Sequence, residues 1–212
     1  MTEAPTDPTD FAARTHALLA SHGGHLLGLA KASIEHSWAH GADRVMDLEL
    51  STQPPELAAQ GACFVTLNRH DRLRGCIGSP EAWRPLALDV VANANRAAFH
   101  DPRFPPLKSP EIEGLTLHLS VLSPAQPFPV NDQADLLAQL TPGTDGLIIK
   151  DQGRGALFLP SVWAQLPDPA QFLAHLKAKA GLPVDHWSAD FHAWRFIAPE
   201  THGAWGDIST RA

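Results

Sequence analysis

The sequence predicts an α+β fold built on an antiparallel β-sheet with flanking helices. Two observations lead to this prediction: strand-like and helical segments are interspersed along the chain, and hairpin-type turns dominate the connections between strands. The clearest hairpin joins residues 62–67 to residues 72–77 through a turn at 68–71. A doubly wound parallel sheet would need a crossover between neighbouring strands, so the short turns favour the antiparallel arrangement.

Four segments show the apolar spacing or the end signals of helices. They are residues 10–40, 85–100, 132–140 and 169–179. In the first, Asp10 is a candidate N-cap, Gly23-Gly24 predicts a break, and Gly41 is a stop signal. The second has an apolar stripe that indicates its buried face. The stripe consists of Leu86, Val90, Ala94 and Ala97.

Four further segments are predicted to be strands. They are residues 115–122, 146–150, 155–159 and 194–197. The first alternates apolar and polar residues throughout, which is typical of a strand with one buried face. We expect residues 1–9 to be a disordered leader, residues 10–198 to form one structural unit, and residues 199–212 to be a loose tail.

The composition describes an acidic protein of ordinary globular character. The 212 residues carry 16 Lys and Arg against 23 Asp and Glu, a formal net charge of −7. Because phosphate backbones and anionic lipids repel such a chain, binding to nucleic acid or to a membrane surface is disfavoured. The chain has two cysteines, no signal-peptide pattern and no apolar run of about 20 residues, which favours a soluble cytoplasmic protein.

The strand around Cys76 has the residues of a candidate reactive site. Strand alternation predicts that Arg74 and Cys76 share a face, about 7 Å apart along the backbone. A guanidinium at that distance favours thiolate over thiol. The adjacent Gly75 and Gly78 would leave the sulfur uncovered and allow a ligand to approach the backbone. The alternative is that Cys76 is a small core residue, as free cysteines usually are.

A second candidate segment follows the helix that ends near residue 100. Arg103 could bind a carboxylate or phosphate through two parallel hydrogen bonds, and Phe104 lies next to it. Asp101 could orient Arg103 or transfer protons. Alternatively, Asp101 and Arg103 could simply tie down the loop by pairing with each other and with backbone groups.

The two cysteines and the histidines suggest further possibilities. If the hairpin turn is symmetric about residues 69–70, Cys63 lies directly opposite Cys76, and a redox pair is conceivable. His36 and His40 have helical i,i+4 spacing, but no third ligand follows at a diagnostic spacing, so we predict no metal and no cofactor. Phosphate-binding glycine motifs and the serine-hydrolase elbow are absent from the sequence, which disfavours those enzyme classes.

At these two segments the sequence resembles a known family, the AMMECR domain, whose prokaryotic members are also called AmmeMemoRadiSam system protein A. The hallmark LRGCIG stands at residues 73–78, and DPRFPPL stands at residues 101–107. Further blocks follow the order of the family. They are FVTL at 64–67, SVLSP at 120–124, GLII at 146–149 and KAGLP at 179–183. One departure is Lys177, where relatives often have cysteine.

The resemblance implies a fold, a location for the site and a set of partners. It implies a larger lobe on an antiparallel sheet, a smaller lobe, and a cleft between them that contains the LRGCIG segment. It also implies association with a Memo-type protein and with a radical S-adenosylmethionine protein. The biochemical activity of the family is unsettled, so the resemblance does not decide whether the protein is an enzyme.

Three functional interpretations remain open. In the first, Cys76 is a nucleophile or covalent carrier activated by Arg74, with Asp101 in support, and Arg103, Gly75, Gly78 and Phe104 bind an anionic substrate. In the second, the LRGCIG strand and the DPRF loop form a non-catalytic groove that docks a partner protein. In the third, which the net charge disfavours, a patch of arginines binds nucleic acid. The patch would comprise Arg69, Arg72, Arg74 and Arg103.

Overall fold

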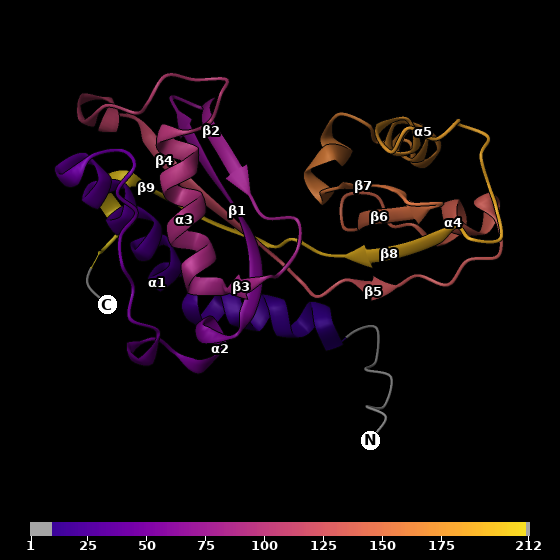
Figure 1. Cartoon of the computed structure of the whole chain (residues 1–212), viewed down its shortest axis with the longest axis horizontal. Helices are drawn as coiled ribbons and strands as arrows, with labels where there is room; N and C mark the ends of the chain where they lie inside the picture. The colour runs from indigo at the N-terminus through magenta and orange to yellow at the C-terminus, as the bar shows by residue number, and fades with distance from the viewer. Residues whose placement is uncertain (1–9, 211–212) are drawn as a thin grey trace. The chain divides into compact units, whose positions relative to one another are not determined.

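The computed structural model describes residues 10–210, which fold into two compact units (Figure 1). The large unit comprises Ala13–Leu122 and the C-terminal segment from Pro199. The small unit comprises Ser123–Ala198, with residues 10–12 grouped with it. The helices and antiparallel sheets confirm the predicted α+β class. The predicted leader, residues 1–9, lies outside the described residues.

The large unit is built on an antiparallel sheet in the strand order β2-β1-β4-β9, with the short β3 paired to β1. These strands are β1 (Gln60–Arg69), β2 (Arg72–Gly78), β3 (Arg84–Pro85), β4 (Leu115–Leu122) and β9 (Glu200–Ala204). Alternate residues of the central strands are fully buried, such as Val65 and Leu67 on β1 and Leu117 and Leu119 on β4. One face of the sheet therefore forms the core of the unit.

Two long helices share that core. They are α1 (Asp10–His40) and α3 (Leu86–Phe99), and α3 lies alongside β1 and β2 (Figure 1). The predicted stripe of α3 is buried, and Ser33 on α1 donates a hydrogen bond from Oγ to the Val91 carbonyl at 2.7 Å. Shorter helices complete the unit. They are α2 (Pro55–Ala58) and the 3₁₀ turns at Leu50–Thr52, Ser109–Ile112 and Trp205–Asp207.

The other face of the large sheet is polar and partly exposed, and we call it the polar face. Its residues form a row across four strands, because Thr66 pairs with Cys76 on β2 and with His118 on β4, and His118 pairs with His202 on β9. Directly paired residues in an antiparallel sheet project to the same side. A thiol, a hydroxyl and two imidazoles therefore share this face.

The β1–β2 hairpin differs from the predicted register. Its turn consists of His70 and Asp71, with φ values of 48° and 59°, which matches the two-residue turns that suit hairpins. Gly75 pairs with Leu67, but the next pair is Leu73 with Asn68, so Arg74 is an extra, bulged residue. The later turn and the bulge shift the register, so that Thr66, not Cys63, lies opposite Cys76. The predicted pairing of the two cysteines is therefore wrong, and both are free.

The first helix has no break at Gly23-Gly24. It runs continuously for 31 residues and ends where Gly41 adopts a φ of 111°, the stop that the sequence predicted. Gly23 is buried, and a Cβ there would lie 3.3 Å from the Thr201 side chain on β9. The low helix propensity of glycine led to the predicted break. Gly23 is instead explained by its close packing against β9.

The prediction of a loose tail at residues 199–212 was wrong, because residues 200–210 complete the large unit. They form β9 and a 3₁₀ turn, and Trp205 is only 4% exposed, with its ring centroid 5.4 Å from that of Trp38. Lys31 Nζ donates to the carbonyls of Trp205 and Ile208 at 3.0 and 2.9 Å. The strand ETHGA has no apolar alternation, so its sequence does not reveal the pairing with β4.

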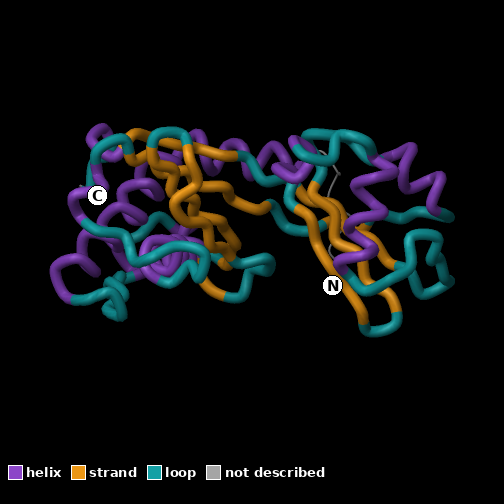
Figure 2. Tube along the Cα trace, turned by 90° about the horizontal axis from the view of Figure 1, so that it is seen from above, coloured by secondary structure: helices purple, strands orange, loops and turns teal. Residues whose placement is uncertain are grey.

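The small unit contains a second group of strands (Figure 2). They form an antiparallel sheet in the order β5-β8-β6-β7. Its elements are β5 (Gln126–Pro127), α4 (Gln133–Gln139), β6 (Gly146–Asp151), β7 (Arg154–Phe158), a 3₁₀ turn (Pro160–Ala164), α5 (Pro169–Lys179) and β8 (His192–Phe196). Helix α5 has the bounds that the sequence predicted. Among the described residues, no helix has the length and apolarity that a membrane span requires.

Lys177 on α5 is fully buried and satisfied. Its Nζ donates to Gln133 Oε1 at 2.7 Å and to the carbonyls of Val184 and His186 at 3.1 and 2.6 Å. Burial lowers the pKa of this amine below its ordinary value. Lys177 thus ties α5 to α4 and to the loop that follows α5.

Candidate functional site

Cys76 lies on the polar face of β2 and is only partly buried. Its Sγ accepts a hydrogen bond from Thr66 Oγ1 at 3.2 Å, and its backbone N–H donates to Asp101 Oδ2 at 2.8 Å. Cys63, by contrast, is fully buried on the core face, and desolvation raises the pKa of its thiol well above the ordinary value. Of the two cysteines, Cys76 is the one that solvent and reagents can reach.

Asp101 anchors the loop after α3 to the strand that carries Cys76. The carboxylate, 4% exposed, accepts the backbone N–H groups of Cys76 and Arg103 at 2.8 and 3.1 Å. It also accepts Nε and Nη2 of Arg103 at 3.0 and 2.7 Å. The Arg103 guanidinium is the main cause that holds the pKa of Asp101 far below its usual range. A carboxylate so fully engaged supports the orienting role of Asp101 rather than proton transfer.

Arg103 is held in place on one side and open on the other. Beyond its two bonds to Asp101, Nη2 donates to the Cys76 carbonyl at 3.1 Å, while 53% of the side chain stays exposed. Asp101 chiefly, and the Cys76 side chain to a smaller extent, raise the pKa of Arg103 above its ordinary value. The guanidinium beside the sulfur is therefore that of Arg103.

Arg74 does not serve Cys76 as the alternation pattern predicted. Its Nε and Nη2 bind Glu111 Oε1 and Oε2 at 2.8 and 3.0 Å, and this pairing is the main cause that lowers the pKa of Glu111. The bulge at Arg74 interrupts the alternation of side chains along β2. The Arg74 guanidinium therefore pairs with Glu111 in the turn at Ser109–Ile112. Leu73, the residue before the bulge, is 43% exposed.

Phe104 lies close to both arginines. The guanidinium carbons of Arg74 and Arg103 are 5.9 and 5.5 Å from its ring centroid, within the range of cation–π attraction. One aromatic ring thus lies near two positively charged groups. The ring of Phe104 is only partly buried, so it can contact a substrate as the sequence analysis expected.

The two glycines of the motif face protein atoms rather than an open surface. A Cβ on Gly75 would lie 2.1 Å from the Ala97 carbonyl oxygen on α3. A Cβ on Gly78 would lie 2.2 Å from the Phe64 ring and 2.6 Å from the Cys63 carbonyl oxygen. Both glycines are therefore required for packing, which corrects the expectation that they admit a ligand to the backbone.

A basic pocket lies at the turn end of the β1–β2 hairpin. It has a volume of about 460 Å³, and its lining includes three arginines and one glutamate. The lining residues are Arg69, His70, Arg72, Leu73, Arg74 and Glu111. Within the described part of the chain, Arg74 Nη1 is a buried nitrogen without a hydrogen-bond partner.

A second polar cluster is structural. Asp89 on α3 is fully buried and accepts Ser79 Oγ, Arg84 Nε and the Cys63 N–H at 2.6, 2.7 and 2.9 Å. Asn93, one turn later, donates to Asp89 at 3.0 Å. These bonds fasten the start of α3 to the ends of β1 and β2. Sequence reasoning missed this cluster, and it also missed Thr66 and Glu111. The contacts of Asp89 with Cys63 and of Arg74 with Glu111 join residues 26 and 37 positions apart, which no local pattern indicates.

The fold and the site define a class: an α+β protein whose main sheet carries a partly exposed cysteine next to an arginine that a buried aspartate holds in place. Comparison with known proteins identifies the class. The AMMECR1 family model matches residues 27–200, and the chain belongs to this family.

Individual relatives agree with this assignment. Protein MK0488 of Methanopyrus kandleri is 36% identical over 188 residues, which cover 85% of this chain and 88% of the relative. A protein of Thermococcus gammatolerans is 38% identical over 185 residues, covering 83% and 87%. The crystal structure of the uncharacterized protein PH0010 from Pyrococcus horikoshii superposes with a TM-score of 0.73 at 34% identity, covering 86% of this chain and 91% of that one.

Proposed function

We propose that this protein binds an anionic group of a substrate at Arg103, next to the thiol of Cys76, and that it acts as component A of an AmmeMemoRadiSam modification system. The observation that carries the proposal is Arg103 itself: Asp101 holds its guanidinium from one side, while 53% of the side chain faces solvent. An arginine oriented in this way loses little further freedom on binding a carboxylate or phosphate.

The surroundings of the sulfur support a covalent role for Cys76. Thr66 Oγ1 already donates to Sγ, and the Arg103 guanidinium adjoins it. Both groups are hydrogen-bond donors next to the sulfur. A substrate whose anionic group binds Arg103 would thus be held within reach of a nucleophile. The proposed partners, a Memo-type protein and a radical S-adenosylmethionine protein, would supply or consume the group carried at this position.

The proposal predicts that the two cysteines differ strongly in reactivity. Treatment of the native protein with iodoacetamide at neutral pH should modify Cys76 rapidly and leave Cys63 unmodified, because Cys63 is fully buried and Cys76 is not. Peptide mass spectrometry over a time course measures both rates. Unfolding in urea provides the control, since both thiols should then react. Equal, slow modification of the two native thiols would contradict the covalent role.

A docking function is the second candidate, and exposed apolar groups near the arginines favour it. Leu73, which lines the basic pocket, is 43% exposed, and Ile112, which follows the lining residue Glu111, is 36% exposed. Apolar and arginine side chains together are typical interface anchors. Docking alone predicts that Cys76→Ser preserves the activity of the whole system, whereas Arg103→Ala prevents co-purification with the partner proteins. Loss of activity in Cys76→Ser with the complex intact supports the covalent role instead.

A further inference from the structure

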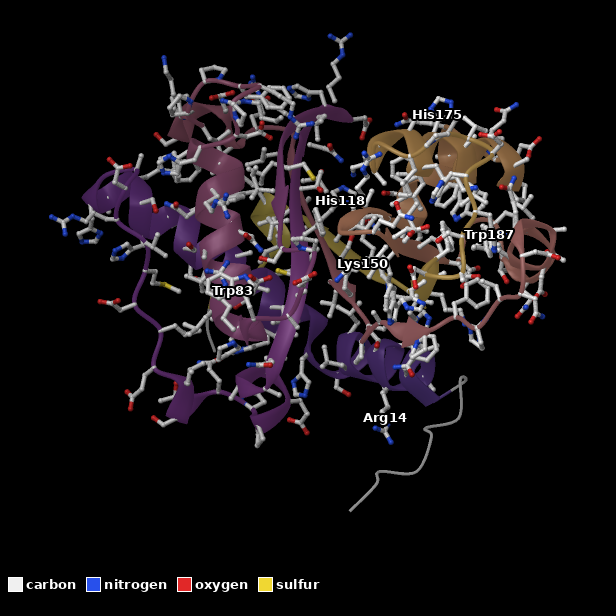
Figure 3. The ribbon with its side chains drawn as sticks, turned by 45° about the vertical axis from the view of Figure 1, so that its right-hand side comes forward. Arg14, Trp83, His118, Lys150, His175 and Trp187 are labelled. Carbon is white, nitrogen blue, oxygen red and sulfur yellow. The ribbon has the colours of Figure 1, made fainter. Side chains whose placement is uncertain are left out.

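The polar face of the large sheet carries a second cluster of chemically active side chains, distinct from the Arg103 site. His118, labelled in Figure 3, lies on β4, and His202 is its direct partner on β9. Their imidazole rings are stacked, with centroids 5.1 Å apart and an interplanar angle of 19°. Glu200, two residues before His202, projects from the same face of β9.

The three side chains converge on one point. His118 Nδ1 lies 2.8 Å from Glu200 Oε1, and one donor atom from each of His118, Glu200 and His202 lies within 4.8 Å of the other two. Two ligands that each lie about 2 Å from a metal ion are at most about 4 Å apart. Closing this cluster around an ion therefore needs side-chain movements of about 1 Å, which partly exposed side chains can make. His118 and Glu200 are 24% and 48% exposed.

The backbone beneath the cluster is part of the paired sheet. β4 lies between β1 and β9 in the sheet, and its other face is covered by the core through Leu117 and Leu119, both fully buried. Ser120, the direct partner of Glu200, donates from Oγ to Glu200 Oε2 at 3.2 Å and so orients the carboxylate. Ligands fixed on paired strands and held by neighbouring hydrogen bonds are the arrangement that metal sites require.

We propose that His118, Glu200 and His202 bind a divalent transition-metal ion, with zinc as the ion that this donor set suits best. Two imidazoles and one carboxylate match zinc, whereas calcium and magnesium require mainly oxygen ligands. Three protein ligands leave one position of a tetrahedral ion open to water or to a substrate atom. The site rests on this cluster alone and does not depend on the function proposed for Cys76 and Arg103.

Zinc titration of the full chain, without an affinity tag, tests the site. Calorimetry of the wild-type protein should show one high-affinity zinc equivalent, and Co²⁺ should give visible absorption bands of a low-symmetry site. His202→Gln and Glu200→Gln should each weaken zinc binding at least about 10-fold. Loss of a group that hydrogen-bonds to a ligand already lowers metal affinity by about that factor, and loss of the ligand itself should lower it no less. Ca²⁺ and Mg²⁺ should not compete.

Two controls separate this site from other zinc ligands of the chain. The double variant His36→Gln/His40→Gln removes another stacked histidine pair, with ring centroids 4.2 Å apart on α1, and should bind zinc like the wild type. Cys76→Ser, which alters the same row of the polar face, should also bind normally. Glu200 is at an exposed position of β9, so Glu200→Gln should unfold like the wild type when both are measured without metal. Wild-type affinity in both ligand variants, or loss of the zinc equivalent in either control, would overturn the proposal.

Discussion

Replacing Asp101 by asparagine should lower the free energy of unfolding by about 2–4 kcal/mol at pH 7. The buried carboxylate accepts two backbone N–H groups and two guanidinium N–H groups, and it joins the loop after α3 to β2. An amide of the same size keeps one acceptor oxygen but turns an NH₂ group toward donors. The Arg103 guanidinium then loses its counter-charge and its fixed orientation.

The pH dependence of this effect has a definite sign. The pKa of Asp101 is lowered in the folded state, so its ionised form stabilises the protein at every pH above the ordinary value of 3.8. This contribution diminishes as the pH falls below that value and approaches the folded-state pKa. The stability gap between wild type and Asp101→Asn should therefore be full at pH 7 and narrower at about pH 3.

Denaturant unfolding at the two pH values measures this gap. Asp43→Asn serves as the control, because the Asp43 side chain is 94% exposed and its loss should change stability by less than about 0.5 kcal/mol. A gap that is small at pH 7, or one that widens on acidification, is inconsistent with an ionised anchoring role for Asp101.

Gly75→Ala should destabilise the protein by a comparable amount, about 2–4 kcal/mol. The new methyl group would lie 2.1 Å from the Ala97 carbonyl oxygen, a backbone atom within α3 that cannot rotate away. Either α3 or β2 must shift, and both elements position the site: α3 precedes Asp101, and β2 carries Cys76. We therefore also expect slower modification of Cys76 by anionic reagents in this variant.

Gly24→Ala is the matched control. Gly24 lies in the exposed part of α1, no atom lies within 4 Å of its added Cβ, and alanine favours a helix over glycine by about 0.5–1 kcal/mol. Thermal unfolding of the two variants should therefore give shifts of opposite sign. Unchanged stability of Gly75→Ala would mean that α3 and β2 pack less closely than the structure shows.

The sequence predicted the bounds of those helices and strands that have a regular apolar pattern or clear end signals. Residues 115–122 alternate without interruption and form β4 with those bounds, and residues 169–179 have clear start and stop residues and form α5. The register of the β1–β2 hairpin could not be predicted, because the turn at His70-Asp71 and the bulge at Arg74 together change which residues face each other.

The candidate site was predictable only in part, for a related reason. Asp101, Arg103 and Cys76 belong to motifs that the sequence displays, and the structure brings them together. The partner of Arg74 was not predictable, since Glu111 lies 37 positions away in an irregular turn. The same applies to His118 and Glu200, which are separated by 82 positions and meet only because the C-terminal strand pairs with β4.

The central claim is that Arg103, rather than Arg74, places an anionic group beside the Cys76 thiol. Its most direct test compares the rates at which Cys76 reacts with iodoacetate, which is anionic, and with iodoacetamide, which is neutral, so that the ratio isolates anion binding from thiol reactivity. We expect the iodoacetate rate divided by the iodoacetamide rate to fall at least about fivefold in Arg103→Gln, because this variant loses a charge-assisted contact to the reagent. The same ratio should stay near the wild-type value in Arg74→Gln. An unchanged ratio in Arg103→Gln, or a fall confined to Arg74→Gln, would contradict the account.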